Sequence, residues 1–242
     1  MAPQCEVPEP IVSNLSQLRS LCGLPVDTQQ SLFPTQDVVL VCIDCEAYDR
    51  DQLKITEVGV AVLDTRDIAG EPPSRENAEK WLSKIKYAHY RLMEHSHLVN
   101  RTFVKGRERF FNFGTTAWIN LDDAHPILRR IFRDPVRLSQ SADFNVPIDD
   151  AGRNVVFVAH GASKDGAFLK ELGFSFLEVP NVVGTLDTQR LGLGSPTESV
   201  GLRRLLNSLA IQHSNLHNGG NDAAYTLQAV MVLALIDHEH PG

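Results

Sequence analysis

Two carboxylates, Asp44 and Glu46, stand two residues apart at the end of an apolar run. That run, VVLVCID from Val38 to Asp44, predicts a buried β-strand. Side chains on a strand alternate between its faces, so both carboxylates should project to the same side. Two carboxylates this close raise each other's pKa, and a divalent cation relieves the repulsion. The pair therefore favours a metal site, although a strand that runs into an acidic loop would show the same residues.

A further carboxylate, Asp165, follows a second apolar run. Residues Val155 to Ala159 predict another strand, and residues 164–172 predict the helix behind it. Asp165 thus falls at the start of a helix, where a carboxylate can act in chemistry or simply cap the helix.

The last acidic position of interest, Asp222, begins the final helix, which is predicted over residues 222–236. His217 precedes it by five residues, and Gly219 and Gly220 give the chain between them freedom to turn. Such a turn could bring the imidazole of His217 back over Asp222. Taken separately, Asp222 is also typical of a helix cap and His217 of a surface histidine.

Taken in order, these signals resemble the DEDD superfamily of 3′–5′ exonucleases, which have a ribonuclease-H-like fold. The order is D-x-E on a first strand, an aspartate after a later strand, and H-x4-D at the last helix. The spacing of the third motif is similar to that of the H-x4-D branch, called DEDDh, and the resemblance covers roughly residues 38–237. The catalytic positions that it implies are Asp44, Glu46, Asp165, His217 and Asp222.

Two shorter segments add to the resemblance, and two features depart from it. Glu57-Val58-Gly59 resembles the family's second strand, and Leu186-Asp187-Thr188 resembles its strand-end DT. The first motif continues with Ala47-Tyr48-Asp49, where common members have Thr-Thr-Gly. The chain also has a long insertion that carries HYRLMEHSHLVN and FFNFGTT. These departures look like a fungal lineage with members tied to RNA metabolism and gene silencing.

The resemblance implies hydrolysis of single-stranded nucleic acid, RNA favoured, from the 3′ end to 5′-nucleoside monophosphates. Two Mg²⁺ or Mn²⁺ ions about 3.5–4 Å apart can activate water and neutralise the transition state. Oxygen ligands suit these cations, so Asp44, Glu46, Asp165 and Asp222 would hold them. His217 would be the general base, because an ordinary histidine pKa of about 6.5 suits neutral operation.

The net charge of −7 argues against a protein that coats nucleic acid through bulk positive charge. The window from Arg75 to Arg137 differs, with 13 Lys/Arg against 7 Asp/Glu and nine of the 17 aromatic residues. Interleaved cations and rings are typical of a single-strand groove, although a core with a solvated basic face has the same composition. The candidate phosphate contacts are Arg91, Arg101, Lys105, Arg107 and Arg109, and Tyr48 is a candidate to stack on the terminal base.

The elements that must position these residues follow an α/β pattern. Strands are predicted over 38–44, 55–63, 84–92, 155–159 and 182–186, and helices over 124–132, 164–172, 200–211 and 222–236. The short spacer after the first strand predicts an antiparallel hairpin, so we expect a ribonuclease-H-like mixed β-sheet flanked by α-helices. Residues 1–36 are predicted to be a polar lead with a short helix, and residues 37–242 an exonuclease-like domain with an insertion at about 67–123. Loops are expected over 67–77 and 134–154.

The composition, 43% hydrophobic and 22% charged over 242 residues, is that of a folded domain and excludes disordered and fibrous chains. The apolar run Ala229 to Ile236 is too short to span a bilayer, so no membrane partner is expected. No secretory signal is evident, and the four cysteines are expected to be reduced, which predicts a cytoplasmic or nuclear location. Cys42 and Cys45 lack the second pair that a structural zinc requires.

Two other functions stay open. The first is a nuclease-derived module that binds RNA or a protein without turnover, against which the intact carboxylate set argues. The second is an aspartyl-phosphate phosphatase, but those enzymes usually have D-x-D after the first strand, where this chain has Glu46. The sequence does not choose between RNA and DNA, and a homodimer stays open because several members of the superfamily dimerise.

Overall fold

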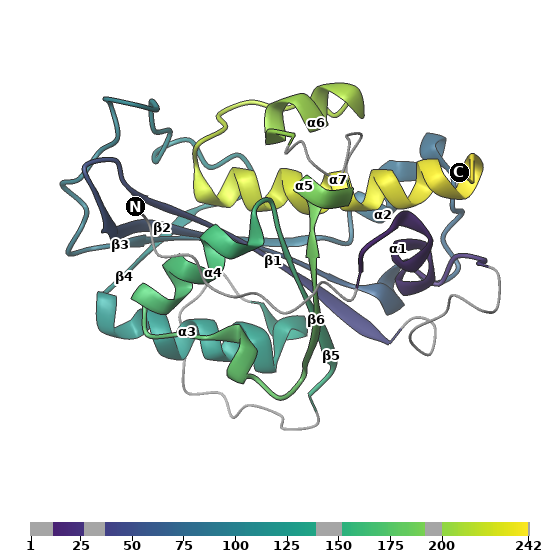
Figure 1. Ribbon diagram of the computed structural model, residues 1–242, viewed down its shortest axis with the longest axis horizontal. Coiled ribbons are helices and arrows are strands. Elements are labelled where there is room, and N and C mark those ends of the chain that lie inside the picture. Colours follow the sequence, from purple (N-terminus) through teal and green to yellow (C-terminus); the bar gives the residue numbers. More distant parts are fainter. Residues whose placement is uncertain (1–11, 27–36, 139–151, 192–199, 242) are drawn as a thin grey trace.

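A six-stranded mixed sheet forms the centre of the computed structural model, which describes residues 12–26, 37–138, 152–191 and 200–241 (Figure 1). Its strand order is β4-β3-β2-β1-β5-β6. Strands β1, β2 and β3 pair antiparallel, whereas β4 pairs parallel with β3, β5 with β1 and β6 with β5. The strands are β1 (Val38–Tyr48), β2 (Asp51–Asp64), β3 (Lys86–Leu92), β4 (Thr116–Ile119), β5 (Asn154–Ala159) and β6 (Val182–Asp187). The predicted α/β fold with a mixed sheet is confirmed.

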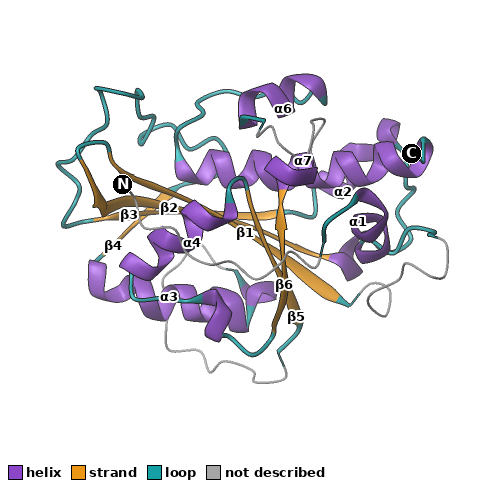
Figure 2. Cartoon of the chain, in the orientation of Figure 1, coloured by secondary structure: helices purple, strands orange, loops and turns teal. Residues whose placement is uncertain are grey.

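Helices cover both faces of the sheet (Figure 2). The face that carries the chain's last helix has α1 (Leu15–Leu21), α2 (Ala78–Leu82), α6 (Leu202–Ser208) and α7 (Gly219–Glu239), and the opposite face has α3 (Leu121–Arg133) and α4 (Ala162–Glu171). The short α5 (Thr188–Leu191) follows β6 directly. Single turns of 3-10 helix lie at Thr65–Ile68, Arg75–Asn77, Pro135–Arg137 and Phe176–Glu178. No helix of the described segments combines the length and apolar character needed to cross a membrane.

Alternation along β1 decides which way its polar end points. Leu40 and Cys42 pack in the core beneath α7, whereas Val41 and Cys45 pack in the core beneath α3 and α4. Cys42 and Cys45 therefore lie on opposite faces, as their spacing predicts. Cys22, Cys42 and Cys45 are free, buried thiols.

Helix α7 is buried along almost its whole length because it is apolar on every side. Its first turn approaches β2 so closely that a Cβ on Gly59 would lie 1.8 Å from the carbonyl oxygen of Gly219. Glycine at position 59 therefore permits this contact between helix and sheet. Helix α1 also packs on α7, with Leu18 and Leu21 in the shared core and Arg19 Nε 2.7 Å from Asp237 Oδ2.

Several predicted boundaries were wrong. Strand β2 begins four residues before the predicted Ile55, so the hairpin turn is only Asp49-Arg50. Residues 75–82, the first three of which were assigned to a loop, form a 3-10 turn followed by α2, and β4 was not predicted at all. Both elements are very short, so their structure depends on packing rather than on a periodic pattern. Most of the loop predicted over 134–154 lies outside the described residues.

Candidate active site

Asp44 and Glu46 lie at the end of β1 on the face of the sheet that α7 covers, as strand alternation predicts. They line a cavity of about 560 Å³ together with Lys164 on α4, His217 and Asp222. The pairing of β1 with β2 slips after Glu46, so the strand's regular geometry ends at this residue. The two carboxylates thus belong to the last regularly paired residues of β1, where the edge of the sheet borders the cavity.

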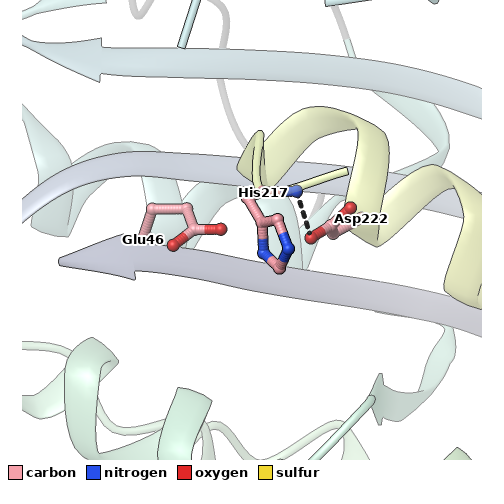
Figure 3. Close-up of side chains that lie close together, drawn as sticks. All are labelled: Glu46, His217 and Asp222. Atoms are coloured by element: carbon pink, nitrogen blue, oxygen red, sulfur yellow. Dashed lines mark hydrogen bonds between the residues drawn. The ribbon is translucent and has the colours of Figure 1, made fainter. Parts of the chain in front are cut away.

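The loop that enters α7 places His217 beside Asp222 (Figure 3). The backbone N–H of His217 donates to Asp222 Oδ2 at 2.9 Å, and its carbonyl accepts from the N–H of Arg107 at 3.0 Å. Asn218 caps the helix, since its side chain accepts from the N–H of Asn221 at 3.0 Å. His217 has φ 69°, a left-handed conformation that is costly for a residue other than glycine. The surrounding hydrogen bonds therefore maintain a strained backbone that orients the imidazole.

Glu46, His217 and Asp222 form a cluster that could hold a metal ion. One potential ligand atom from each residue lies within 4.8 Å of the other two. Asp222 is 7% exposed, and its Oδ1 is buried without a hydrogen-bond partner. A buried carboxylate oxygen without a partner is costly unless a cation or a proton satisfies it. This oxygen and the neighbouring carboxylates fit the hard divalent cations that oxygen donors prefer.

Asp165 lies behind the cavity rather than on its wall. Its Oδ1 accepts the backbone N–H of Cys45 at 3.1 Å, so it is attached to β1 between the two other carboxylates. Asp187, at the end of β6, fixes the start of α4 because it accepts the N–H groups of Gly161 and Ala162, both at 3.0 Å. A carboxylate at a helix N-terminus also complements the helix dipole. The strand-end DT segment thus positions the helix that carries Asp165.

The four carboxyl groups share an environment that disfavours their charged forms. Burial raises the pKa of Glu46 to about 8, and the charges of Asp222 and Glu57 add to the effect. Burial likewise raises the pKa of Asp165 and of Asp222 to about 7. In each case a hydrogen bond from a backbone N–H, that of Cys45 to Asp165 and that of His217 to Asp222, lowers the pKa and so opposes the rise. The pKa of Asp44 lies well above its ordinary value, first through burial and then through Asp165 and Asp222. Cations bound here would therefore displace protons.

Two cations next to the carboxylates were not recognised in the sequence. The positive charge of Lys164 lowers the pKa of all four carboxyl groups and so opposes their mutual repulsion. The pKa of His217 lies below its ordinary value, first through burial and then through the charges of Arg203 and Lys164. The imidazole is thus neutral near pH 7 and able to accept a proton. Only the fold brings α4 and α6 to this cavity, so the sequence carried no signal for either residue.

The insertion between β3 and β4 holds the loop that carries His217. The side chain of Asn221 accepts the N–H of Asn112 at 2.8 Å and donates to the carbonyls of Phe110 and Asn215. On the other side of the cavity, Asn100 donates to the carbonyl of Ala47 at 2.7 Å. The insertion therefore bridges β1 and α7 and encloses the site rather than extending away from it.

A buried polar chain supports the first turn of α7. Glu57, 3% exposed, lies opposite Glu46 on β2 and accepts the N–H of Gly219 at 3.2 Å. His89 Nε2 lies 2.9 Å from Glu57 Oε2, and His89 Nδ1 lies 2.9 Å from the hydroxyl oxygen of Thr116 on β4. A glutamate inside an apolar strand is the signal that could have identified Glu57 before the structure was known.

The predicted substrate contacts divide into three groups. Lys105 and Arg107 line a second cavity of about 420 Å³ that also includes His217. Arg91 is 5% exposed and stacks on Trp118, with its guanidinium carbon 4.4 Å from the ring centroid. The remaining predicted contacts are absent from the described walls of these two cavities: Tyr48 at the end of β1, Arg101, and Arg109, whose Nε is 3.7 Å from Glu108 Oε1.

Comparisons with known proteins relate this arrangement to a family. Residues 39–233 match the DEDDh family model described as DNA polymerase III subunit epsilon-like, C-terminal domain. An uncharacterized nucleolar protein of Schizosaccharomyces pombe is 30% identical over 197 residues, which are 78% of this chain and 65% of that protein. The Saccharomyces cerevisiae protein named Good for full DBP5 activity protein 2 is 26% identical over 83% of this chain and 36% of its own length. The chain thus spans less than two thirds of either relative.

Proposed function

Because the chain belongs to the DEDDh family described as DNA polymerase III subunit epsilon-like, C-terminal domain, we propose that it is a metal-dependent 3′–5′ exonuclease. The substrate is single-stranded nucleic acid, and the products are 5′-nucleoside monophosphates. The observation that carries the proposal is the cavity at the end of β1, where Asp44, Glu46, His217 and Asp222 meet. Nothing in packing requires three carboxylates and an imidazole around one cavity, and their repulsion costs stability.

Each of the five residues has a role that its position supports. Asp44, Glu46 and Asp222 hold divalent cations through carboxylate oxygens, and Asp165, bonded to the backbone of β1, adds a further negative charge from behind the cavity. When bound, two such ions activate water and neutralise the charge that develops on the phosphate. Lys164, on the cavity wall, supplies a further positive charge toward the phosphate.

His217 is the general base in this proposal. Its imidazole lies beside Glu46 and Asp222, is partly open to the cavity, and is neutral near pH 7 because its pKa is lowered. A general base must reach the proton that it removes, and the two backbone hydrogen bonds of His217 restrict where its ring can go. The strained loop therefore serves to orient the base.

RNA is the favoured substrate, and the nucleus is the favoured location. The support for both is the name of one relative rather than a contact in the cavity: the S. pombe relative is named as nucleolar, and the nucleolus is a compartment rich in RNA. Contact with a 2′-hydroxyl is what would let the site distinguish RNA from DNA.

A time course on 5′-labelled single-stranded RNA and DNA of matched sequence tests the proposal. Each strand is incubated with Mg²⁺, Mn²⁺ or EDTA, with Asp44→Asn as the inactive variant and Asp67→Asn, which lies in the 3-10 turn after β2, as a matched control. We expect a metal-dependent ladder of 3′-shortened products from the wild type and the control only. A ladder from Asp44→Asn that matches the wild type would contradict the assignment.

A binding module without turnover is the second candidate. One S. cerevisiae relative is named for supporting the activity of another protein, DBP5, and that name describes assistance rather than catalysis. If neither strand is shortened although the protein is folded and binds Mn²⁺, this candidate replaces the exonuclease.

A further inference from the structure

A second cavity adjoins the proposed catalytic one on the other side of His217. Its volume is about 420 Å³, against about 560 Å³ for the catalytic cavity. Phe103, Val104 and His217 line both, so the two cavities meet at the imidazole. The walls of the second come from the insertion, from α6 and from the loop before α7: Phe103, Val104, Lys105, Arg107, Arg203, Asn215, Leu216 and His217.

The charge of this second cavity is opposite to that of the catalytic one. Its walls contain Lys105, Arg107 and Arg203 and no carboxylate, in a chain whose net charge is −7. Within the described part of the chain, none of these three side chains forms an ion pair. Three cations without acidic partners in a concave surface complement an anion, and a polyanionic strand offers one phosphate after another.

An exposed aromatic ring stands where the two cavities meet. Phe103 is 78% exposed, the largest exposure among the large apolar side chains described, and the neighbouring Val104 is 43% exposed. Leaving a phenylalanine this open to water is unfavourable unless another group covers it. Proteins that hold single strands combine a cationic groove with rings on which bases stack.

The position of the second cavity beside the catalytic one indicates which part of a bound nucleic-acid strand each cavity would hold. A 3′ exonuclease cuts the bond before the terminal nucleotide, so the carboxylates of the larger cavity must meet the scissile phosphate. The rest of the strand must then leave that cavity, and the cationic cavity is the neighbour with which it shares His217 and Phe103.

We propose that the cavity of Lys105, Arg107 and Arg203 binds the phosphate backbone of the strand upstream of the scissile bond, with Phe103 stacked on a base. This proposal rests on the proposed exonuclease function, and it adds a second binding site for the same substrate. It assigns a binding role to Arg203 on α6, and it implies recognition through phosphates and ring faces, independent of base sequence. Substrates that end at the scissile phosphate do not reach this site.

Strand binding gives the first test, in the Asp44→Asn background, which prevents turnover. The probe is a fluorescein-labelled single strand of ten nucleotides, and Ca²⁺ occupies the metal site. Arg203→Gln is compared with Arg129→Gln, which makes the same charge change at an exposed position of α3 on the opposite face. We expect Arg203→Gln to weaken binding at least tenfold and to reduce the salt slope by about one. Arg129→Gln should change the affinity less than twofold.

Hydrolysis gives the second test, in the otherwise wild-type protein. The p-nitrophenyl ester of thymidine 5′-monophosphate reports on the catalytic cavity alone, and the ten-nucleotide strand reports on both cavities. Arg203→Gln should lower kcat/KM for the strand at least tenfold more than for the ester. Equal losses on both substrates, or equal strand affinities of the Arg203 and Arg129 variants, would overturn the proposal while the exonuclease assignment stands. If Arg203→Gln weakens strand binding while the wild type hydrolyses neither substrate, the result would support this site and refute the exonuclease.

Discussion

The backbone amide of His217 donates to Asp222 Oδ2 at 2.9 Å, so the carboxylate proposed to hold metal also fixes the loop of the proposed base. The other oxygen of Asp222 is buried and without a partner, which leaves it free for a cation. One aspartate thus couples two parts of the site. The hydrogen bond closes the turn of four residues that lies between them, at the start of α7.

That coupling predicts different stabilities for two variants of Asp222. Asp222→Asn retains an oxygen that can accept the amide of His217, whereas Asp222→Ala loses it. Thermal unfolding in EDTA should therefore find the alanine variant less stable than the asparagine variant by about 1–2 kcal/mol. Both variants remove the charge, so the comparison isolates the hydrogen bond. Equal melting temperatures would show that the bond does not stabilise the loop.

The left-handed backbone of His217 predicts that substitutions there separate stability from activity. Asparagine tolerates φ near 69°, whereas a β-branched valine does not. We expect His217→Asn to unfold near the wild-type temperature and His217→Val to lose about 1–3 kcal/mol. Both should lower kcat by about 10²–10⁴ because each removes the base. A His217→Asn protein with wild-type kcat would exclude histidine as the base.

The contact between Gly59 and the start of α7 predicts that any side chain at this position displaces the helix. A Cβ at residue 59 would lie 1.8 Å from Gly219 O and 2.4 Å from Gly220 N, which are backbone atoms. Gly59→Ala should therefore destabilise the protein by about 1–3 kcal/mol or more. Gly201→Ala is the control, because a Cβ there meets nothing within 4 Å. Denaturant unfolding of the two variants measures the difference, and similar midpoints would contradict the close contact.

The raised carboxyl pKa values predict that the metal-free protein loses stability as the pH rises. In the folded state the pKa values of Asp165 and Asp222 are about 7 and that of Glu46 is about 8, against ordinary values near 4. The folded protein therefore holds protons that the unfolded chain releases, so this stabilisation is complete below about pH 4 and lost through pH 7–8. In EDTA, the melting temperature should fall between pH 5 and pH 8, by about 2–4 °C per kcal/mol lost.

Glu46→Gln and added Mn²⁺ provide the controls for this pH dependence. The glutamine has no proton to release, so the variant should show a smaller fall. Mn²⁺ binds the ionised carboxylates and should raise the melting temperature most at pH 8. A melting temperature that rises from pH 5 to pH 8 in EDTA would contradict the shared buried environment of these groups.

The exposed ring of Phe103 predicts a loss of strand affinity without a loss of stability. Phe103→Ala should weaken the binding of a ten-nucleotide single strand by about 1–3 kcal/mol, the usual contribution of one stacked base. Its unfolding temperature should not change, because the ring is 78% exposed. Leu177→Ala, at a 40% exposed position after α4, is the control and should bind as the wild type does. Fluorescence anisotropy measures both affinities, and equal values for the two variants would rule out stacking on Phe103.

The sequence by itself determined the elements with strong local patterns and the side-chain faces that follow from them. The apolar run from Val38 predicts a buried strand, and period-two alternation then places Asp44 and Glu46 on one face. The long apolar helix α7 was also predictable, as was the position of Asp222 at its start. These features depend on residues near one another in the chain, which is why periodicity reveals them.

Only the tertiary structure decided what stands around those carboxylates. Lys164 reaches the catalytic cavity because α4 packs there, and Arg203 lies beside it because α6 places this side chain in an adjoining cavity with His217 and Asp222. The loop of His217 is held by Arg107, which is 110 residues away. The buried Glu57–His89 pair and the short strand β4 likewise depend on pairing between distant segments. Such contacts have no local period, because their energy comes from burial and hydrogen bonding that exist only after the chain has folded.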